Sequence, residues 1–300
     1  MHEFLQQVIN GISLGAIYAL IALGYSMVYG LLKFINFAHG DVLMIGAFAG
    51  FYAAPIVHHL FPDPWMTTAI VLFWAMGVCA ILGVLIERLA YRPLRNQPKL
   101  AVLITSIGVS LLLSYGGQIL FGVNQKAFPD LLPPISIPLG AGVTVSGNHL
   151  LVIVVTLFLL VGLSWIVLKT RFGLALRALS QNRDAAALMG VNSNAVIAMT
   201  FALGSALAGA AGVLYSMNIH SIEPLMGTLP GIKAFVAAVL GGIGSLPGAA
   251  VGGLLLGLSE CLLGGSFLSS YRDAIAFGIL ILILLIRPAG LFGSSAAEKV

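Results

Sequence analysis

The sequence predicts an all-α integral membrane protein, a polytopic helical bundle of about eight to ten transmembrane segments with one or two broken or re-entrant segments. Hydrophobic residues make up 59% of the chain and charged residues only 8%, whereas a soluble domain carries roughly a quarter charged residues. Apolar runs of about 20 residues, long enough to cross a hydrocarbon core about 30 Å thick, recur along the sequence. No soluble domain fits between them, so residues 1–300 are expected to form one transmembrane domain.

The helical segments follow from these apolar runs and from the polar or glycine-rich stretches that separate them. Nine helices are expected, at about residues 5–31, 42–60, 65–87, 100–121, 149–168, 194–218, 229–245, 248–266 and 271–287.

Basic residues set the expected orientation, because short cytoplasmic loops retain Lys and Arg. Two segments between predicted helices are rich in them, and both are expected inside. Two spans separate these segments, so the Pro-rich connection 127–142 is expected outside, with the amino terminus outside and the carboxyl terminus inside if all nine helices cross. The basic residues are Arg88, Arg92, Arg95 and Lys99 in the first segment, and Lys169, Arg171, Arg177 and Arg183 in the second. The net charge of +4 is explained by these loops and indicates no binding to nucleic acid.

The helical pattern fails inside apolar sequence at two places, "FINFAHGD" (34–41) and "LGGIGSLPGAAVGG" (240–253). Transporters built from repeats often carry broken helices in matching halves, where freed backbone groups face a water-filled path. The two breaks are therefore candidates for the translocation path. The alternative is that both are tight loops at the membrane surface.

The first break carries three polar residues, Asn36, His39 and Asp41. Polar groups at membrane depth are costly unless they meet water or each other. We therefore expect these three side chains to line or gate the path. In the alternative interpretation Asp41 caps the next helix and His39 lies at the interface.

Two charges, Lys233 and Glu260, lie within the late glycine-rich region. If the two helices there turn between Leu246 and Pro247, each charge is about 13 to 14 residues from the turn, or roughly 20 Å at 1.5 Å per residue. They would lie at the same depth and form a partly buried ion pair. Alternatively, each side chain extends separately to the interface.

Small residues recur at every fourth position in two segments. This spacing lets helix backbones approach closely and predicts tight helix packing. The residues are Gly244, Gly248 and Gly252 in one segment, and Gly204, Ala208 and Gly212 in the other.

Four motifs, "INFAHGD", "IERLAYRPLR", "VLGGIGSLPGA" and "IRPAGLFG" (286–293), together resemble the LivH-type permease subunit of bacterial branched-chain amino-acid ABC importers. The resemblance extends from about residue 5 to 293. It implies a bacterial inner-membrane permease that has no catalysis of its own. The implied partners are a homologous second permease, two cytoplasmic ATPase subunits and a periplasmic substrate-binding protein.

The same resemblance implies that ATP and Mg are bound by the ATPase subunits and that this chain holds no cofactor or metal. In agreement, the sequence has no G-x-x-x-x-G-K-[ST] motif for phosphate binding.

The segment "DAAALMG", Asp184–Gly190, is similar to the EAA-x-x-x-G element by which ABC importer permeases dock on their ATPases, with Asp184 in place of Glu. The Ile-x-Leu-Pro ending of that element is missing. The resemblance makes residues 169–193 the expected coupling loop, although a solvated connecting helix is the alternative. The expected contact residues are Arg177, Arg183, Asp184, Ala185, Ala186, Leu188, Met189 and Gly190. Small residues allow close approach, an apolar side chain fills a cleft, and the arginines could meet acidic groups of the partner.

Two other classes of function are alternatives to an ABC importer. A proton-coupled secondary transporter would also use broken helices, with His39, Asp41 and Glu260 as relay groups. ATP dependence of uptake would separate it from an ABC importer. An intramembrane hydrolase around Ser245 and His39 is disfavoured because the chain lacks a G-x-S-x-G motif.

Overall fold

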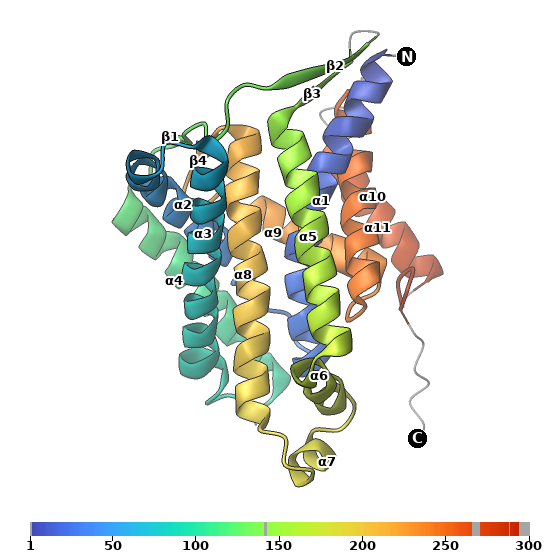
Figure 1. The fold of residues 1–300 in the computed structure, drawn as a ribbon. Coiled ribbons are helices and arrows are strands. Elements are labelled where there is room, and N and C mark those ends of the chain that lie inside the picture. The colour runs from blue at the N-terminus through green and yellow to red at the C-terminus, as the bar shows by residue number, and fades with distance from the viewer. Residues whose placement is uncertain (1, 96, 141–142, 266–270, 288, 294–300) are drawn as a thin grey trace.

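The structure is a computed structural model that describes residues 2–95, 97–140, 143–265, 271–287 and 289–293. Long helices run side by side between the two ends of the molecule, as Figure 1 shows. Each of the nine predicted segments is helical, and the predicted all-α polytopic bundle is confirmed. Their bounds are α1 His2–Leu32, α2 His39–Leu60, α3 Pro64–Ile86, α4 Lys99–Phe121, α5 Gly147–Lys169, α8 Ser193–Ile219, α9 Thr228–Gly241, α10 Leu246–Gly264 and α11 Arg272–Ile286.

Seven spans among the described residues are long and apolar enough to cross a membrane. They are the first five of these helices, α8 and α10, and the α3 span continues through a π-helix, η1, Glu87–Tyr91. The helix α9 has 14 residues and α11 has 15. At 1.5 Å per residue such helices reach only about 21 to 23 Å, less than a hydrocarbon core of about 30 Å.

The remaining elements lie at the two ends of the bundle (Figure 1). One end carries a hairpin of β2 Ser136–Gly140 and β3 Val143–Ser146, and the short pairing of β1 Lys126–Ala127 with β4 Ser221–Ile222. The opposite end carries α6 Arg171–Gln181 and α7 Arg183–Leu188. The backbone N–H of Thr144 donates to Gln6 Oε1 at 3.0 Å. The start of α1 and the Pro-rich connection are thus at the same end, opposite the 169–193 loop, as the charge pattern predicted.

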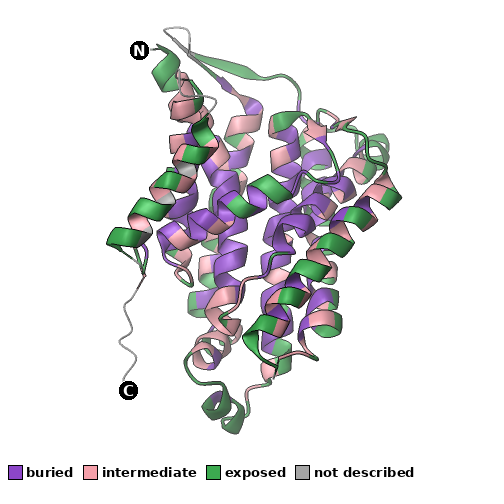
Figure 2. Cartoon of the chain, turned by 180° about the vertical axis from the view of Figure 1, so that it is seen from behind, coloured by how far each residue is buried: buried purple, intermediate pink, exposed green. Residues whose placement is uncertain are grey.

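The helix α1 lies at the centre of the bundle and is the most buried of the seven spans. It packs against α10, α8, α9 and α5. Of the seven spans, α4 and α5 are the least buried, as expected of helices that face lipid. Figure 2 shows the buried residues gathered on the central helices. The bundle is therefore organised around α1.

Glycines bring α1 and α10 into backbone contact. A Cβ on Gly257 would lie 2.2 Å from the backbone nitrogen of Gly15, and one on Gly253 would lie 2.4 Å from that of Ala19. Gly11 and Gly15 on α1 and Gly253 and Gly257 on α10 are each four residues apart, the spacing that allows two helices to cross closely.

The predicted small-residue series in α8 also lies at helix contacts. A Cβ on Gly212 would lie 2.2 Å from the carbonyl oxygen of Leu43, and one on Gly204 would lie 3.4 Å from that of Gly24. Ala208 is fully buried. Tight packing along this face is confirmed, and it attaches α8 to both α1 and α2.

The turn between α9 and α10 lies at residues 242–245, so the expected turn between Leu246 and Pro247 was wrong. Gly242 and Gly244 have φ of +104° and +92°, which glycine adopts without strain. The side chain of Ser245 then accepts from Gly248 N at 3.2 Å and caps α10, whose first turn holds Pro247. Gly244 is accordingly a turn residue, whereas Gly248 and Gly252 pack against α9 as predicted.

Enlarging Gly257 tests the α1–α10 contact. Because its Cβ position overlaps backbone atoms, Gly257→Leu should separate the helices and destabilise the fold by about 3 kcal/mol or more. The measurement is the thermal stability of purified protein in detergent. Gly162→Leu is the matched control, since nothing lies within 4 Å of a Cβ there. Equal stability of the two variants would contradict the packing argument.

Candidate functional site

The first break is the segment 33–38 between α1 and α2. The chain turns at Lys33, which has φ of +56°, and α2 begins at His39, whose backbone N–H donates to Asn36 O at 3.2 Å. Only Asn36 of the three predicted polar residues therefore lies in the break itself. His39 is the first residue of α2, and Asp41 is in its first turn.

The three polar side chains are buried, with exposed fractions of 4% for Asn36, 1% for His39 and 4% for Asp41. The Tyr91 hydroxyl donates to Asn36 Oδ1 at 2.6 Å. The Asp41 carboxylate accepts from the hydroxyls of Ser110 and Ser114, one turn apart on α4, at 2.5 Å each. Asp41 thus attaches α4 to α2. Asp41 also lies in the first turn of α2 and bonds its own backbone there, so the alternative in which it caps this helix is compatible with the link to α4 and stays a prediction.

The His39 ring fills a space that only a glycine on α1 leaves open. A Cβ on Gly24 would lie 2.3 Å from His39 Nε2. The ring packs edge-on against Tyr25 at 4.6 Å between centroids and makes a hydrogen bond to the backbone of Ile21. Its Nε2 atom has no hydrogen-bond partner among the described residues. In this conformation the side chain faces protein, and its role in gating stays a prediction.

The two breaks are neighbours in space. A Cβ on Gly30, near the end of α1, would lie 3.5 Å from Gly244 Cα in the second turn. The start of α2 meets the start of α9: a Cβ on Gly40 would lie 2.5 Å from the carbonyl oxygen of Gly227. The two contacts lie at opposite ends of α9, so the segments on either side of the first break border both ends of this short helix.

Lys233 lies between two carboxylates. Its Nζ is 2.7 Å from Glu260 Oε1 and 2.8 Å from Asp273 Oδ1. The Tyr18 hydroxyl donates to Glu260 Oε2 at 2.8 Å, and Arg272 Nε is 4.0 Å from Glu260 Oε1. This cluster links α1, α9, α10 and α11. The sequence predicted the pair of Lys233 and Glu260. It did not predict that Asp273 and Tyr18 join them, because nothing in the local sequence fixes how α11 or α1 is rotated.

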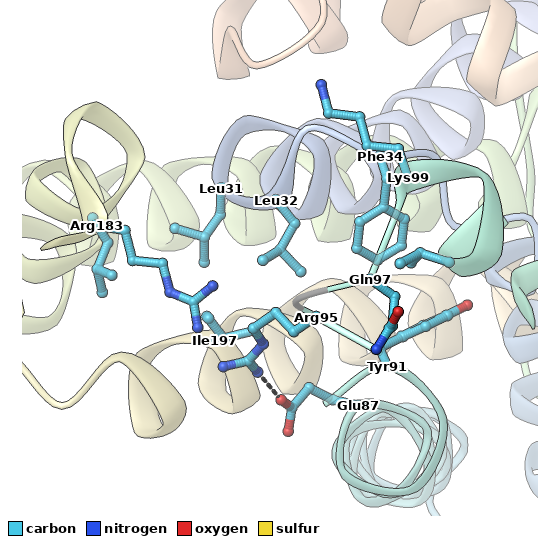
Figure 3. Close-up of a pocket in the computed structure, with 12 residues that line it drawn as sticks. Leu31, Leu32, Phe34, Glu87, Tyr91, Arg95, Gln97, Lys99, Arg183 and Ile197 are labelled. Atoms are coloured by element: carbon cyan, nitrogen blue, oxygen red, sulfur yellow. Dashed lines mark hydrogen bonds and ion pairs between the residues drawn. The ribbon is translucent and has the colours of Figure 1, made fainter. Parts of the chain in front are cut away.

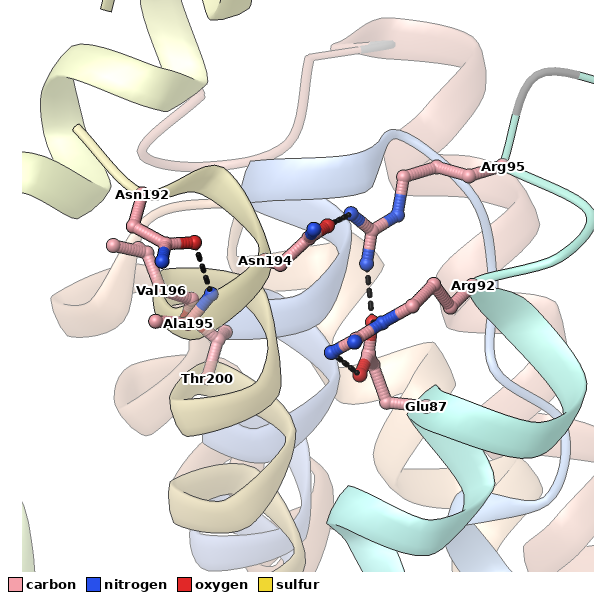
Figure 4. A network of polar contacts seen from close by, with 8 residues as sticks. All are labelled: Glu87, Arg92, Arg95, Asn192, Asn194, Ala195, Val196 and Thr200. Atoms are coloured by element: carbon pink, nitrogen blue, oxygen red, sulfur yellow. Dashed lines mark hydrogen bonds and ion pairs between the residues drawn. The ribbon is translucent and has the colours of Figure 1, made fainter. Parts of the chain in front are cut away.

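A second charge cluster, which the sequence did not predict, surrounds Glu87. The fully buried Glu87 carboxylate pairs with Arg92 at 2.9 Å and with Arg95, and Arg95 also donates to Asn194 Oδ1 at 2.8 Å (Figure 4). Burial lowers the pKa of Arg95 from its ordinary value, Glu87 opposes this, and the charge of Arg183 adds to it. The cluster fastens the 92–98 loop to the start of α8.

Arg177 and Asn182 fix the coupling loop at the bottom of the bundle. Arg177 Nη1 donates to the carbonyl oxygen of Val167, so this arginine holds α6 against the end of α5. This bond uses one of the five N–H donors of the guanidinium, and the contact of Arg177 with a partner stays a prediction. The Asn182 side chain accepts from Ala185 N at 2.9 Å and caps α7.

The helix α7 presents an apolar tip. Ala186 is buried, and it packs with Leu179 and Val196. Leu188 and Met189 are 89% and 85% exposed, among the most exposed large hydrophobic side chains that the structure describes.

The other predicted coupling residues surround this tip. Asp184 and Ala185 are exposed as well, and Gly190 ends the segment with φ of +84°. Arg183 lines a cavity at the same end of the molecule (Figure 3).

Together these features define a class of protein: a polytopic helical-bundle transport protein with neighbouring helix breaks, buried charge clusters and an exposed loop helix. Residues 7–284 match the family described as branched-chain amino acid transport system / permease component. The chain belongs to this family. It is thus a multi-pass transport permease of the inner membrane and not an enzyme.

Individual relatives match along nearly the whole chain. It is 44% identical to the high-affinity branched-chain amino acid transport system permease protein BraD of Pseudomonas aeruginosa, over 100% of this chain and 99% of BraD. It is 40% identical to the corresponding permease protein LivH of Escherichia coli, over 99% of this chain and 98% of LivH. A probable branched-chain amino acid transport permease protein LivH of Methanocaldococcus jannaschii is 31% identical over 91% of this chain and 88% of its own length.

Removing one hydroxyl tests the link between α2 and α4. Ser114→Ala leaves the buried Asp41 carboxylate with one side-chain donor fewer and should destabilise the protein by about 1–3 kcal/mol. Thermal unfolding of the purified permease measures the change. Ser106→Ala is the control on the same helix, because its hydroxyl bonds only Leu103 O. A Ser114→Ala effect no larger than the Ser106→Ala effect would refute the link.

The Lys233 cluster predicts an asymmetric response. Lys233→Met leaves two carboxylates without their shared cation and should cost about 3–5 kcal/mol, whereas Glu260→Gln leaves Lys233 paired with Asp273 and should cost less. The double variant should be milder than the sum of the two single changes. The measurement is a double-mutant cycle on thermal stability and uptake, and simple additivity would show that the two groups do not interact.

Proposed function

We propose that this chain is the membrane permease subunit of an ATP-driven importer of branched-chain amino acids. The observation that carries the proposal is the end-to-end similarity to permeases named for high-affinity branched-chain amino acid transport. Because the sequence lacks a phosphate-binding loop motif, ATP and Mg would be bound by separate ATPase subunits.

The proposed assembly contains a homologous second permease, two cytoplasmic ATPase subunits and a periplasmic binding protein. The apolar tip of α7 supports the ATPase contact. Leu188 and Met189 lie at the end of the molecule whose basic loops mark it as cytoplasmic. Exposed apolar side chains on a loop outside the bilayer are stabilised by docking into a cleft of a partner. Ala186 would hold this tip against the bundle through Leu179.

The helix break is the proposed gate. Each of these three polar side chains contacts a different element. Asn36 accepts from Tyr91 at the end of η1, and His39 packs against Tyr25 on α1. Asp41 accepts from the two serines on α4. A shift of α2 relative to these elements would exchange all three contacts together. The His39 ring fits beside Gly24 and Tyr25 on α1, so a shift of α2 along α1 would have to move this ring out of its present position.

The proton-coupled secondary transporter is the weaker alternative. Its relay would need Glu260 to release and bind protons, but Lys233 and Tyr18 already neutralise and bond this carboxylate. The relatives likewise give it no support. ATP dependence of uptake separates the two mechanisms directly.

The test is uptake of labelled leucine into proteoliposomes that contain the copurified complex and the binding protein. Uptake should require ATP, and a proton gradient alone should not drive it. Replacing the apolar tip, as in Leu188→Asp with Met189→Asp, should abolish uptake and binding-protein-stimulated ATP hydrolysis while the permease still inserts. Arg171→Gln, an exposed change in the same loop, is the control. Leucine uptake that persists without ATP, or in the tip variant, would refute the proposed function or the docking role, respectively.

A further inference from the structure

A cavity of about 350 Å³ lies beside the coupling loop and the helix break. It is bounded by the end of α1, η1, the 92–98 loop, the first turns of α4 and α7, and parts of α6 and α8. Figure 3 shows side chains from these elements pointing toward a common space. A volume of this size is within the range of small-molecule sites, about 300–1,000 Å³.

The cavity carries an unbalanced positive charge. Arg95, Lys99 and Arg183 line it, and Glu87 is the one carboxylate among the lining residues. Glu87 is already bonded by Arg92 and Arg95. In the part of the chain that the structure describes, no carboxylate lies within ion-pair distance of Lys99 or Arg183. The exposed Arg183 side chain extends toward Arg95, whereas the Lys99 ammonium is directed away from this space (Figure 3). Arg183 also acts electrostatically on Arg95. A guanidinium without a carboxylate of its own beside a second arginine attracts an anionic group.

Most of the remaining wall is apolar, with Gln97 and the Tyr91 hydroxyl as its other polar groups. Leu31, Leu32 and Phe34 contribute one side, and Val102 and Ile197 another. A simple inorganic anion would leave this surface uncovered. A ligand that fits both parts of the wall carries an anionic group and a compact hydrocarbon group within a few ångströms of each other.

We propose that this cavity binds a free α-amino acid with an apolar side chain from the cytoplasmic side. The ligand carboxylate would meet Arg183 beside Arg95, its ammonium group would lie toward Glu87 and the Tyr91 hydroxyl, and its side chain would cover the leucine and phenylalanine surface. The inference rests on the proposed function, because the ligand is the class of molecule that the importer would deliver to this side.

The position of the cavity gives such a site a consequence for transport. Arg183 immediately precedes Asp184 in the coupling segment, and Phe34 is two residues from Asn36 in the break. Tyr91, also in the lining, holds Asn36 through a hydrogen bond of 2.6 Å. A bound amino acid would hold α7 and the break in the present arrangement. Accumulated product would thus slow further import.

The first experiment measures equilibrium binding of labelled leucine to the purified complex of permease and ATPase subunits, without the binding protein. Wild-type complex should bind leucine saturably. Arg183→Met should weaken binding about tenfold or more, the loss expected for a charge-assisted hydrogen bond. Arg88→Met is the matched control, because Arg88 is an exposed cation next to Glu87 that does not line the cavity. Arg183→Lys keeps the charge and should weaken binding less than Arg183→Met, which separates loss of the cation from local misfolding.

Competition identifies the anchoring group. 4-Methylpentanoate, which keeps the carboxylate and the hydrocarbon chain, should displace leucine, whereas isoamylamine, which lacks the carboxylate, should not. Leucine on the cytoplasmic face of proteoliposomes should also inhibit ATP-driven uptake in wild type and less so in Arg183→Met.

Several results would overturn the inference. Leucine binding that is absent, or equal in all variants, while ATP-driven leucine uptake is intact, would refute the cavity site alone. Displacement of a bound anion by inorganic phosphate or phosphatidylglycerol vesicles, but not by leucine, would assign the cavity to a phosphate group. Absence of ATP-driven leucine uptake in the wild-type complex would instead refute the proposed function.

Discussion

The close approach of helix backbones to α1 is the constraint on which the rest of the structure depends. Lipid chains are as apolar as leucine, so helices in a bilayer gain little from burying hydrocarbon and associate through packing and hydrogen bonds. Gly15 meets α10, Gly24 leaves room for His39 and borders α8, and Gly30 lies against the turn at Gly244. Each contact along one helix thus sets the position of a different neighbour.

Polar side chains hold the helices that these glycine contacts do not reach. Asp41 binds α4 by accepting from two hydroxyls, and Lys233 binds α11 through its ion pair with Asp273. Glu87 forms ion pairs with two arginines of the 92–98 loop. The Asp41, Glu87 and Lys233 side chains are buried, so each is stable only as part of a bonded set. Close glycine packing therefore positions the helices around α1, and polar bonds position the elements farther out.

The sequence predicted the helices, the relative placement of the ends and the residues of the Lys233–Glu260 pair, because these follow from local composition and spacing. It did not predict Ser110 and Ser114 as partners of Asp41, since that contact depends on how α4 is rotated. It treated Arg92 and Arg95 only as topology determinants. In a regular α-helix, residues five apart do not face each other, but the π-helix η1 adds a residue to the turn, and the Arg92 N–H donates to Glu87 O at 2.7 Å.

The same π-helix places Tyr91 where it can bond Asn36. Ala186 in α7 packs with Leu179, and Leu31 packs both against this pair and against the core cluster that contains Tyr91. A route through α5 would have to pass by Arg177, which fixes α6 to the end of that helix and so resists movement there. We therefore expect motion of α7 to be transmitted toward the break, where Lys33 holds a left-handed backbone conformation that a shift of α2 would release.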